Sequence, residues 1–161
     1  AILQHGFNEQ IGAFAQAFDH PALDASALAI PLVGFLPASD PRMRSTIRAI
    51  QNQLTANGLV YRYRVGDAHD GVAGQEATFA MCTFWMVDNL ALLGEHDEAT
   101  RMFERVTAYA NDVGLFAEEI QPHTRELLGN FPQGFTHLAL IRSAVRLQQG
   151  TRPQSDTRPR G

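Results

Sequence analysis

The 161-residue sequence has no lysine and only one cysteine, and each of these shortages limits the chemistry that the chain can perform. All thirteen basic residues are arginine, and the net charge is -4, so the clustered positive charge that nucleic-acid binding requires is lacking. Because Cys82 is the only cysteine, no internal disulfide can form, and its position in an apolar run indicates a core residue. No stretch approaches the roughly 20 apolar residues that cross a bilayer. We therefore expect a cytoplasmic globular protein that binds neither nucleic acid nor membrane.

Recognisable cofactor and metal motifs are also absent from the sequence. There is no Gly-rich nucleotide-binding fingerprint, no phosphate-binding loop and no His-Glu-x-x-His zinc motif. The six histidines are scattered without the spacing of metal ligands, and no group of carboxylates has the spacing of a calcium loop. We therefore assign no residue to a metal ion or to a cofactor.

Length and composition indicate one globular domain with a substantial core. Hydrophobic residues make up 45% of the chain and charged residues 19%, which is typical of folded proteins. We expect the domain to occupy residues 1–150 and to be followed by a disordered tail, residues 151–161, rich in Pro, Arg and Ser. The start of the sequence has neither an initiator Met nor a basic leader, and is interpreted as a position inside a longer chain.

Apolar residues recur with helical spacing along most of the chain, which predicts an all-α fold with short extended segments in the loops. One helix is expected to begin at the capping residue Asp40, with Pro41 in its first turn, and to end near Gly58. The other helices are expected at residues 23–35, 79–93, 97–110 and 133–148, and a short strand or extended loop at 59–65. Several of these helices are apolar on more than one face. That pattern favours the inner ring of a helical toroid over a four-helix bundle.

The loop from residue 111 to residue 131 contains the adjacent carboxylates Glu118 and Glu119, with apolar residues before them and aromatic residues on both sides. Adjacent side chains of an extended segment point in opposite directions, so one carboxylate can face a pocket while the other makes a structural contact. The alternative is a solvated acidic pair without a catalytic role.

Six motifs in order give the sequence a resemblance to a known family. They are Leu23-Asp24-Ala25-Ser26, Gly34-Phe35-Leu36-Pro37, Tyr61-Arg62-Tyr63, residues 79–85, Ala117-Glu118-Glu119 and Leu128-Gly129-Asn130-Phe131-Pro132-Gln133. Together they resemble the C-terminal half of the catalytic domain of glycoside hydrolase family 15. That family contains glucoamylases, glucodextranases and a bacterial branch of trehalases. The resemblance covers residues 6–147.

The resemblance implies an (α/α)6 toroid and inverting hydrolysis of an α-glucosidic bond. In this mechanism one carboxylic acid protonates the leaving oxygen, and a carboxylate roughly 6.5–9.5 Å away activates water. The Ala117-Glu118-Glu119 motif implies that Glu118 is the general base, with its neighbour Glu119 as the alternative. The general acid of the family lies in an upstream segment that has no match here, and neither Glu9 nor Glu76 fits its pattern. We therefore expect the acid outside these residues and the fragment alone to be inactive.

The same resemblance implies that Arg62, Tyr63 and Glu119 contact the sugar. Arg62 has an equally favoured alternative, a surface ion pair, and Phe84 and Trp85 lie mid-helix, where core packing is expected rather than sugar stacking. The implied substrate is an α-glucoside such as maltose, dextrin, isomaltose or trehalose, and an oligomer is possible.

Two alternatives from other classes stay open, a helical-repeat interaction module and a catalytically inactive remnant. A helical repeat requires a self-similar period, which residues 23–35, 79–93 and 133–148 do not show. Half of a toroid is expected to expose an unusually large apolar surface.

Overall fold

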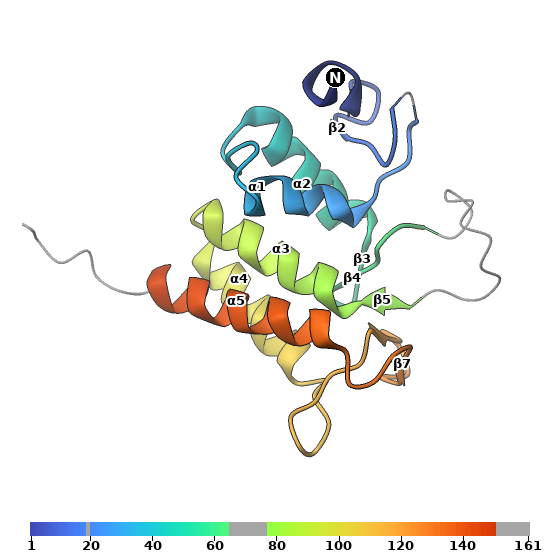
Figure 1. The fold of residues 1–161 in the computed structure, drawn as a ribbon, viewed down its shortest axis with the longest axis vertical. Coiled ribbons are helices and arrows are strands. Elements are labelled where there is room, and N and C mark those ends of the chain that lie inside the picture. Colours follow the sequence, from blue (N-terminus) through green and yellow to red (C-terminus); the bar gives the residue numbers. More distant parts are fainter. Residues whose placement is uncertain (19, 65–76, 151–161) are drawn as a thin grey trace, which may run out of the picture.

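The computed structural model describes residues 1–18, 20–64 and 77–150, and in this part of the chain five α-helices dominate (Figure 1). They are α1 (Ala29–Leu32), α2 (Pro41–Gln53), α3 (Ala80–Leu92), α4 (His96–Thr107) and α5 (Gly134–Gly150). This arrangement confirms the all-α prediction. The predicted tail at 151–161 lies outside the described residues. No helix within the described ranges is both long enough and apolar enough to cross a membrane.

Three small antiparallel sheets accompany the helices in the described residues, and each of their strands has two residues. β1 (Phe7–Asn8) pairs with β2 (Ala13–Phe14), and β3 (Thr55–Ala56) with β4 (Leu59–Val60). The third sheet has the order β5 (Thr78–Phe79), β6 (Glu119–Ile120) and β7 (Leu127–Leu128). The second and third sheets gather at the end of the molecule where α3 and α5 begin (Figure 1).

The prediction of one buried helix over residues 23–35 is wrong. The structure has a 3₁₀ turn, η2 (Ala25–Leu28), followed by the single-turn α1. Pro31 prevents a longer helix because it has no N–H and its ring clashes with the carbonyl four residues before it. Gly34, at φ +75°, then turns the chain, and Val33 and Phe35 are exposed rather than buried.

The start of α2 is confirmed. The Asp40 carboxylate accepts a hydrogen bond from the Arg42 N–H at 2.9 Å, and Pro41 occupies the first turn. The Arg42 guanidinium also pairs with Asp40 at 3.0 Å and lowers the pKa of that carboxyl. The helix ends at Gln53, before Asn57 and Gly58 adopt positive φ.

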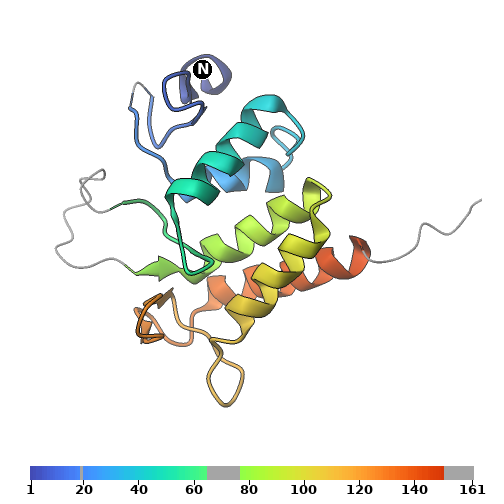
Figure 2. The same cartoon turned by 180° about the vertical axis from the view of Figure 1, so that it is seen from behind.

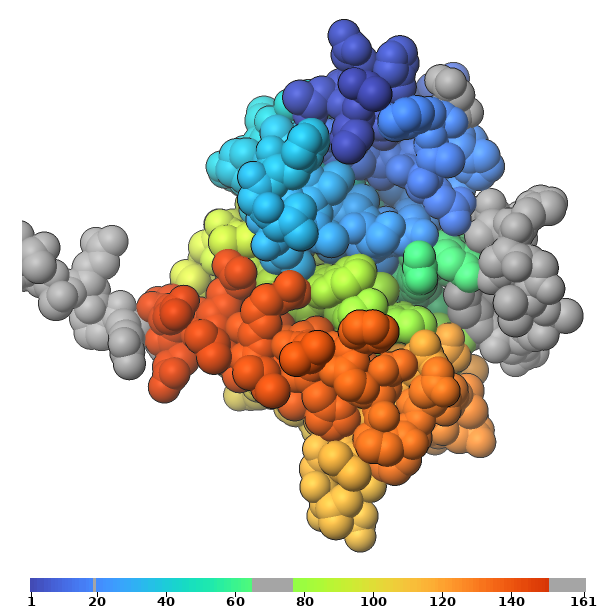
Figure 3. Space-filling model, viewed as in Figure 1, coloured from blue at the N-terminus to red at the C-terminus, as the bar shows by residue number. Residues whose placement is uncertain are grey.

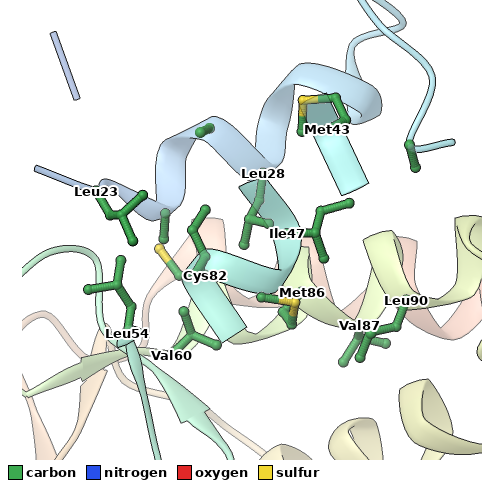
Figure 4. Packing of buried hydrophobic residues seen from close by; sticks show 14 of the residues in the cluster. Leu23, Leu28, Met43, Ile47, Leu54, Val60, Cys82, Met86, Val87 and Leu90 are labelled. Atoms are coloured by element: carbon green, nitrogen blue, oxygen red, sulfur yellow. The ribbon is translucent and has the colours of Figure 1, made fainter. Parts of the chain in front are cut away.

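The main core lies between α2 and α3. The cluster contains Met43 and Ile47 of α2 and Met86 and Leu90 of α3, all labelled in Figure 4. Cys82 is fully buried in the same cluster, as the sequence predicts. Helices α3, α4 and α5 pack against one another, with α5 nearer the viewer in Figure 1 and α4 in Figure 2.

A second apolar cluster fills the space among these three helices and the third sheet. It contains Phe84 of α3, Val106 of α4, Ile120 of β6 and Ala139 of α5. Phe84 is fully buried there, while Trp85 packs against the main core, so both residues contribute to packing as expected.

A buried ion cluster joins α3 to α5. Asp88 is fully buried on α3, and the Nε atoms of Arg142 and Arg146 lie 2.7 and 3.3 Å from its two carboxylate oxygens. Burial raises the pKa of Asp88, and the two guanidinium groups oppose that rise. The carboxylate therefore depends on both arginines to remain charged inside the core.

The outer face of α5 carries an apolar stripe, defined here as Phe135, Leu138, Ile141 and Val145. These side chains are 47–66% exposed and recur every three or four residues. Figure 3 shows α5 lying across the surface of the molecule. Exposed apolar patches in other proteins are commonly association surfaces, which motivates the second prediction below.

We predict that the double substitution Arg142→Met and Arg146→Met destabilises the chain by on the order of 3 kcal/mol, because Asp88 is then buried without a cation. Asp88 binds its proton more tightly in the folded state, so the loss is largest at pH 7 and smaller at pH 4. Urea denaturation at both pH values measures it. Arg101→Met on α4 is the control, and adding Asp88→Asn should restore stability. An equal loss at both pH values would contradict the buried-charge explanation.

We also predict that the chain by itself binds a hydrophobic dye or self-associates through the α5 stripe. Leu138→Ser combined with Ile141→Ser should lower dye fluorescence several-fold and favour the monomer in sedimentation. Leu92→Ser, at an exposed position outside the stripe, should change neither. A monomer that binds no dye would show that the stripe is covered within the chain.

Candidate active site

The loop between α4 and α5 places Glu118 at the end of the molecule where the small sheets gather. The Glu118 carbonyl accepts a hydrogen bond from the Ala80 N–H at 3.0 Å, and the Glu118 N–H donates to the Asn130 carbonyl at 3.0 Å. Its main chain is therefore held on one side by the first residue of α3 and on the other by the segment after β7.

Asn130 also holds the Glu118 side chain. The main-chain N–H of Asn130 donates to Oε2 of Glu118 at 3.1 Å, and its Nδ2 donates to the same oxygen at 2.8 Å. Glu118 is partly buried, so its carboxylate is oriented and still accessible to solvent.

The first turn of α5 holds the two residues before Glu118. The Thr136 hydroxyl donates to the Ala117 carbonyl at 3.1 Å, and the Phe116 N–H donates to Nε2 of His137 at 3.3 Å. Nδ1 of His137 lies 2.7 Å from the Gln133 carbonyl, so this nitrogen carries the proton and Nε2 accepts. Phe116 is buried in edge contacts with the rings of Phe84 and His137. The loop is therefore fixed to α5 immediately before the carboxylate.

Glu119 lies in β6, opposite Phe79 of β5 and Leu128 of β7. Burial raises the pKa of Glu119, and the neighbouring negative charge of Glu118 raises it further. The two adjacent carboxylates are thus in different environments, as expected from their position on an extended segment.

Arg62 and Tyr63 follow β4 at the same end of the molecule. The Arg62 carbonyl accepts a hydrogen bond from the Ala25 N–H at 2.7 Å, and its Nε lies 3.6 Å from Oδ2 of the buried Asp24. The Arg62 guanidinium carbon is 5.9 Å from the centre of the Tyr63 ring. Arg62 therefore makes the ion pair that the sequence gives as its alternative role, while its side chain is still half exposed.

Arg62 and the two glutamates are related through neighbouring strands rather than through a contact of their own that the structure describes. β4 contacts β5, and β5 pairs with β6, which begins at Glu119. Figure 2 shows the same gathering of strands from behind. Within residues 1–18, 20–64 and 77–150, no group of three or more His, Cys, Asp or Glu side chains is arranged to hold a metal ion.

Sequence reasoning assigns no role to Asp24, Asn130 or His137, although the first two lie in the quoted motifs. Asp24 precedes an apolar run and has the sequence signal of a helix cap, which it also fulfils by accepting from the Ser26 N–H at 2.7 Å. Its pairing with Arg62 has no local signal. Asn130 likewise contacts a residue twelve positions away.

The fold matches solved structures of glycosidases. A wild-type glycosidase aligns with 91% of this chain and 41% of its own, at a TM-score of 0.75 and 21% identity. A glycosidase variant solved in complex with glucose aligns equally well, at 20% identity. At this level of identity the likeness establishes the fold, so the chain has the helical fold of these glycosidases.

Sequence comparisons give the family. The model of glycosyl hydrolases family 15 matches residues 1–145. The trehalase of Mycobacterium tuberculosis is 49% identical over 146 residues, which are 91% of this chain and 21% of the relative. The trehalase of Thermoplasma acidophilum is 37% identical over 148 residues, 92% of this chain and 25% of that protein. The chain belongs to glycosyl hydrolases family 15, and it spans between a fifth and a quarter of the length of these relatives.

We predict that Glu119→Gln makes stability less dependent on pH. The pKa of Glu119 is raised above its ordinary value of 4.5, so the folded state holds this proton more tightly than the unfolded state. Stability therefore falls as pH rises from about 4.5 through the folded pKa. Thermal melting at pH 5 and pH 7 should show a smaller difference for Glu119→Gln than for the unsubstituted chain. The exposed Glu126→Gln serves as the control, and an unchanged difference in Glu119→Gln would contradict the prediction.

Proposed function

We propose that this chain is the part of a family 15 catalytic domain that supplies the general base, and that Glu118 is this base. The observation that carries the proposal is the fixed and partly exposed carboxylate of Glu118, oriented by two hydrogen bonds from Asn130. A base must be held within reach of the water that it deprotonates, and the contacts with α3 and α5 provide that rigidity.

The reaction that we propose is inverting hydrolysis of an α-glucosidic bond. Glu118 takes a proton from water as the water attacks the anomeric carbon, while a carboxylic acid outside these 161 residues donates a proton to the leaving oxygen. Water thus gives its hydroxide to the anomeric carbon and its proton to Glu118, and the leaving sugar receives the proton of the acid. The products are two sugars, and no cofactor takes part in the proposed reaction. In such enzymes the two carboxyl groups stand roughly 6.5–9.5 Å apart. The acid and the other wall of the sugar site then belong to a complete (α/α)6 toroid, and the 161 residues are inactive alone.

Trehalose is the substrate that we favour among the α-glucosides. The support comes from the relatives named trehalase, at 49% and 37% identity. Maltose, isomaltose and dextrin are the alternatives, since the loops that select the substrate come from more than this part of the domain. A cytoplasmic location also stays a prediction.

We propose that Arg62, Tyr63 and Glu119 bind sugar hydroxyl groups. The ion pair with Asp24 fixes one side of the Arg62 guanidinium, and the half-exposed remainder offers further N–H donors. Glu119, with its raised pKa, can donate a hydrogen bond when protonated and accept one when charged.

The decisive experiment replaces the matched segment of the Mycobacterium tuberculosis trehalase with residues 1–145 of this chain. We predict that the chimera hydrolyses trehalose, and that Glu118→Gln lowers its kcat by about 10²–10⁴-fold because the water loses its base. Freshly released product should contain one β-glucose and one α-glucose per trehalose, because the attacked ring inverts and the leaving ring keeps its α configuration; NMR of the anomeric protons measures this ratio. Glucose release from trehalose, maltose, isomaltose and dextrin measures the preference.

Glu126→Gln is the matched control, because it makes the same change at an exposed position eight residues further along the chain. Its kcat should equal that of the unsubstituted chimera. An active chimera that keeps full activity in Glu118→Gln would reject Glu118 as the base.

A further inference from the structure

Glu118 and Asn130 form a reciprocal pair joined by three hydrogen bonds. The main chain of Glu118 donates to the Asn130 carbonyl, and Asn130 returns two donors to the Glu118 carboxylate. The first bond fixes the two backbones side by side. The other two fix the position of the side chain relative to the backbone, so the carboxylate has little freedom to rotate.

Gly129 provides the space for this pair. It has φ +73°, a conformation that strongly favours glycine. A Cβ atom at this position would lie 3.0 Å from both Cβ and Oε2 of Glu118. The adjacent residues Gly129 and Asn130 therefore serve one purpose, since the first leaves room for the carboxylate and the second binds it.

Both donors reach the same oxygen of the carboxylate. Within the described residues, the hydrogen bonds of the Glu118 carboxylate all go to Oε2. N–H groups donate and do not accept, so they favour negative charge on Oε2 and oppose protonation there. The opposite oxygen, Oε1, is consequently the better position for an incoming proton.

We propose that Asn130 is a positioning residue that holds Oε2 of Glu118 and thereby leaves Oε1 as the oxygen that takes the proton from water. This inference rests on the proposed function of Glu118 as the base. Asn130 touches neither water nor sugar in this role. It acts through Glu118, by presenting one oxygen in one orientation to the water.

In the active chimera, Asn130→Ala should lower kcat by about 10- to 100-fold, because a small displacement of a base has effects of this size. KM should change less than two-fold, since sugar binding does not involve Asn130. Asn52→Ala, the same substitution at an exposed position on α2, is the matched control and should leave both constants unchanged. An unchanged kcat in Asn130→Ala would overturn the inference.

Asn130→Asp separates positioning from a merely structural role, because it keeps the shape of the side chain. At neutral pH the new carboxylate cannot donate and repels Glu118, so kcat should fall further than in Asn130→Ala. At acidic pH the new carboxyl becomes protonated and can again donate. The ratio of its kcat to that of the unsubstituted chimera should therefore rise several-fold as the pH falls. A constant ratio would overturn the inference even if both variants are less active.

A measurement without catalysis tests the hydrogen bond in the 161-residue chain itself. In an NMR pH titration, the Nδ2 amide signals of Asn130 should shift as Glu118 gains its proton. They should stop shifting in Glu118→Gln, and those of Asn52 should not respond. Asn130 Nδ2 amide signals whose chemical shifts do not change with pH would overturn the inference. If instead the signals respond but Glu118→Gln leaves the chimera fully active, only the proposed function fails.

Discussion

The burial of α3 on nearly every side is the constraint on which the rest of the structure depends. A helix buried in this way has no solvent for its polar side chains, so each must find a partner in a neighbouring element. Thr83 accepts from the Val60 N–H of β4, Asn89 donates to the Leu28 carbonyl of η2, and Asp88 binds the arginines of α5. The polar groups of α3 therefore determine which elements surround it and where they sit.

The candidate site follows from that arrangement because Glu118 is held between the ends of two helices. Ala80, the first residue of α3, donates to its carbonyl, and the first turn of α5 binds the two preceding residues through Thr136 and His137. The position of α5 on α3 is in turn fixed by the ion cluster of Asp88. The orientation of the proposed base is thus a consequence of helix packing as well as of its own loop.

Periodic features of this fold are predictable from the sequence and pairings between distant residues are not. The apolar repeats give α2 to α5 and the cap at Asp40, because these signals are local. The same reasoning fails at residues 23–35, where apolar residues continue but Pro31 breaks the helix. Glu118 is reached through family resemblance. Its partner Asn130 is not, because a side-chain bond across twelve residues follows the path of the loop rather than a period.

The two faces of α5 connect the site to the exposed apolar stripe. One face carries Arg142, which binds Asp88 of α3, and the other presents Leu138 and Ile141 to solvent. The chain spans a fifth to a quarter of the length of these trehalase relatives. Any contact made there acts on the helix whose first turn holds the peptide before Glu118. The exposed stripe and the hydroxyl that binds the Ala117 carbonyl are therefore carried by the same helix.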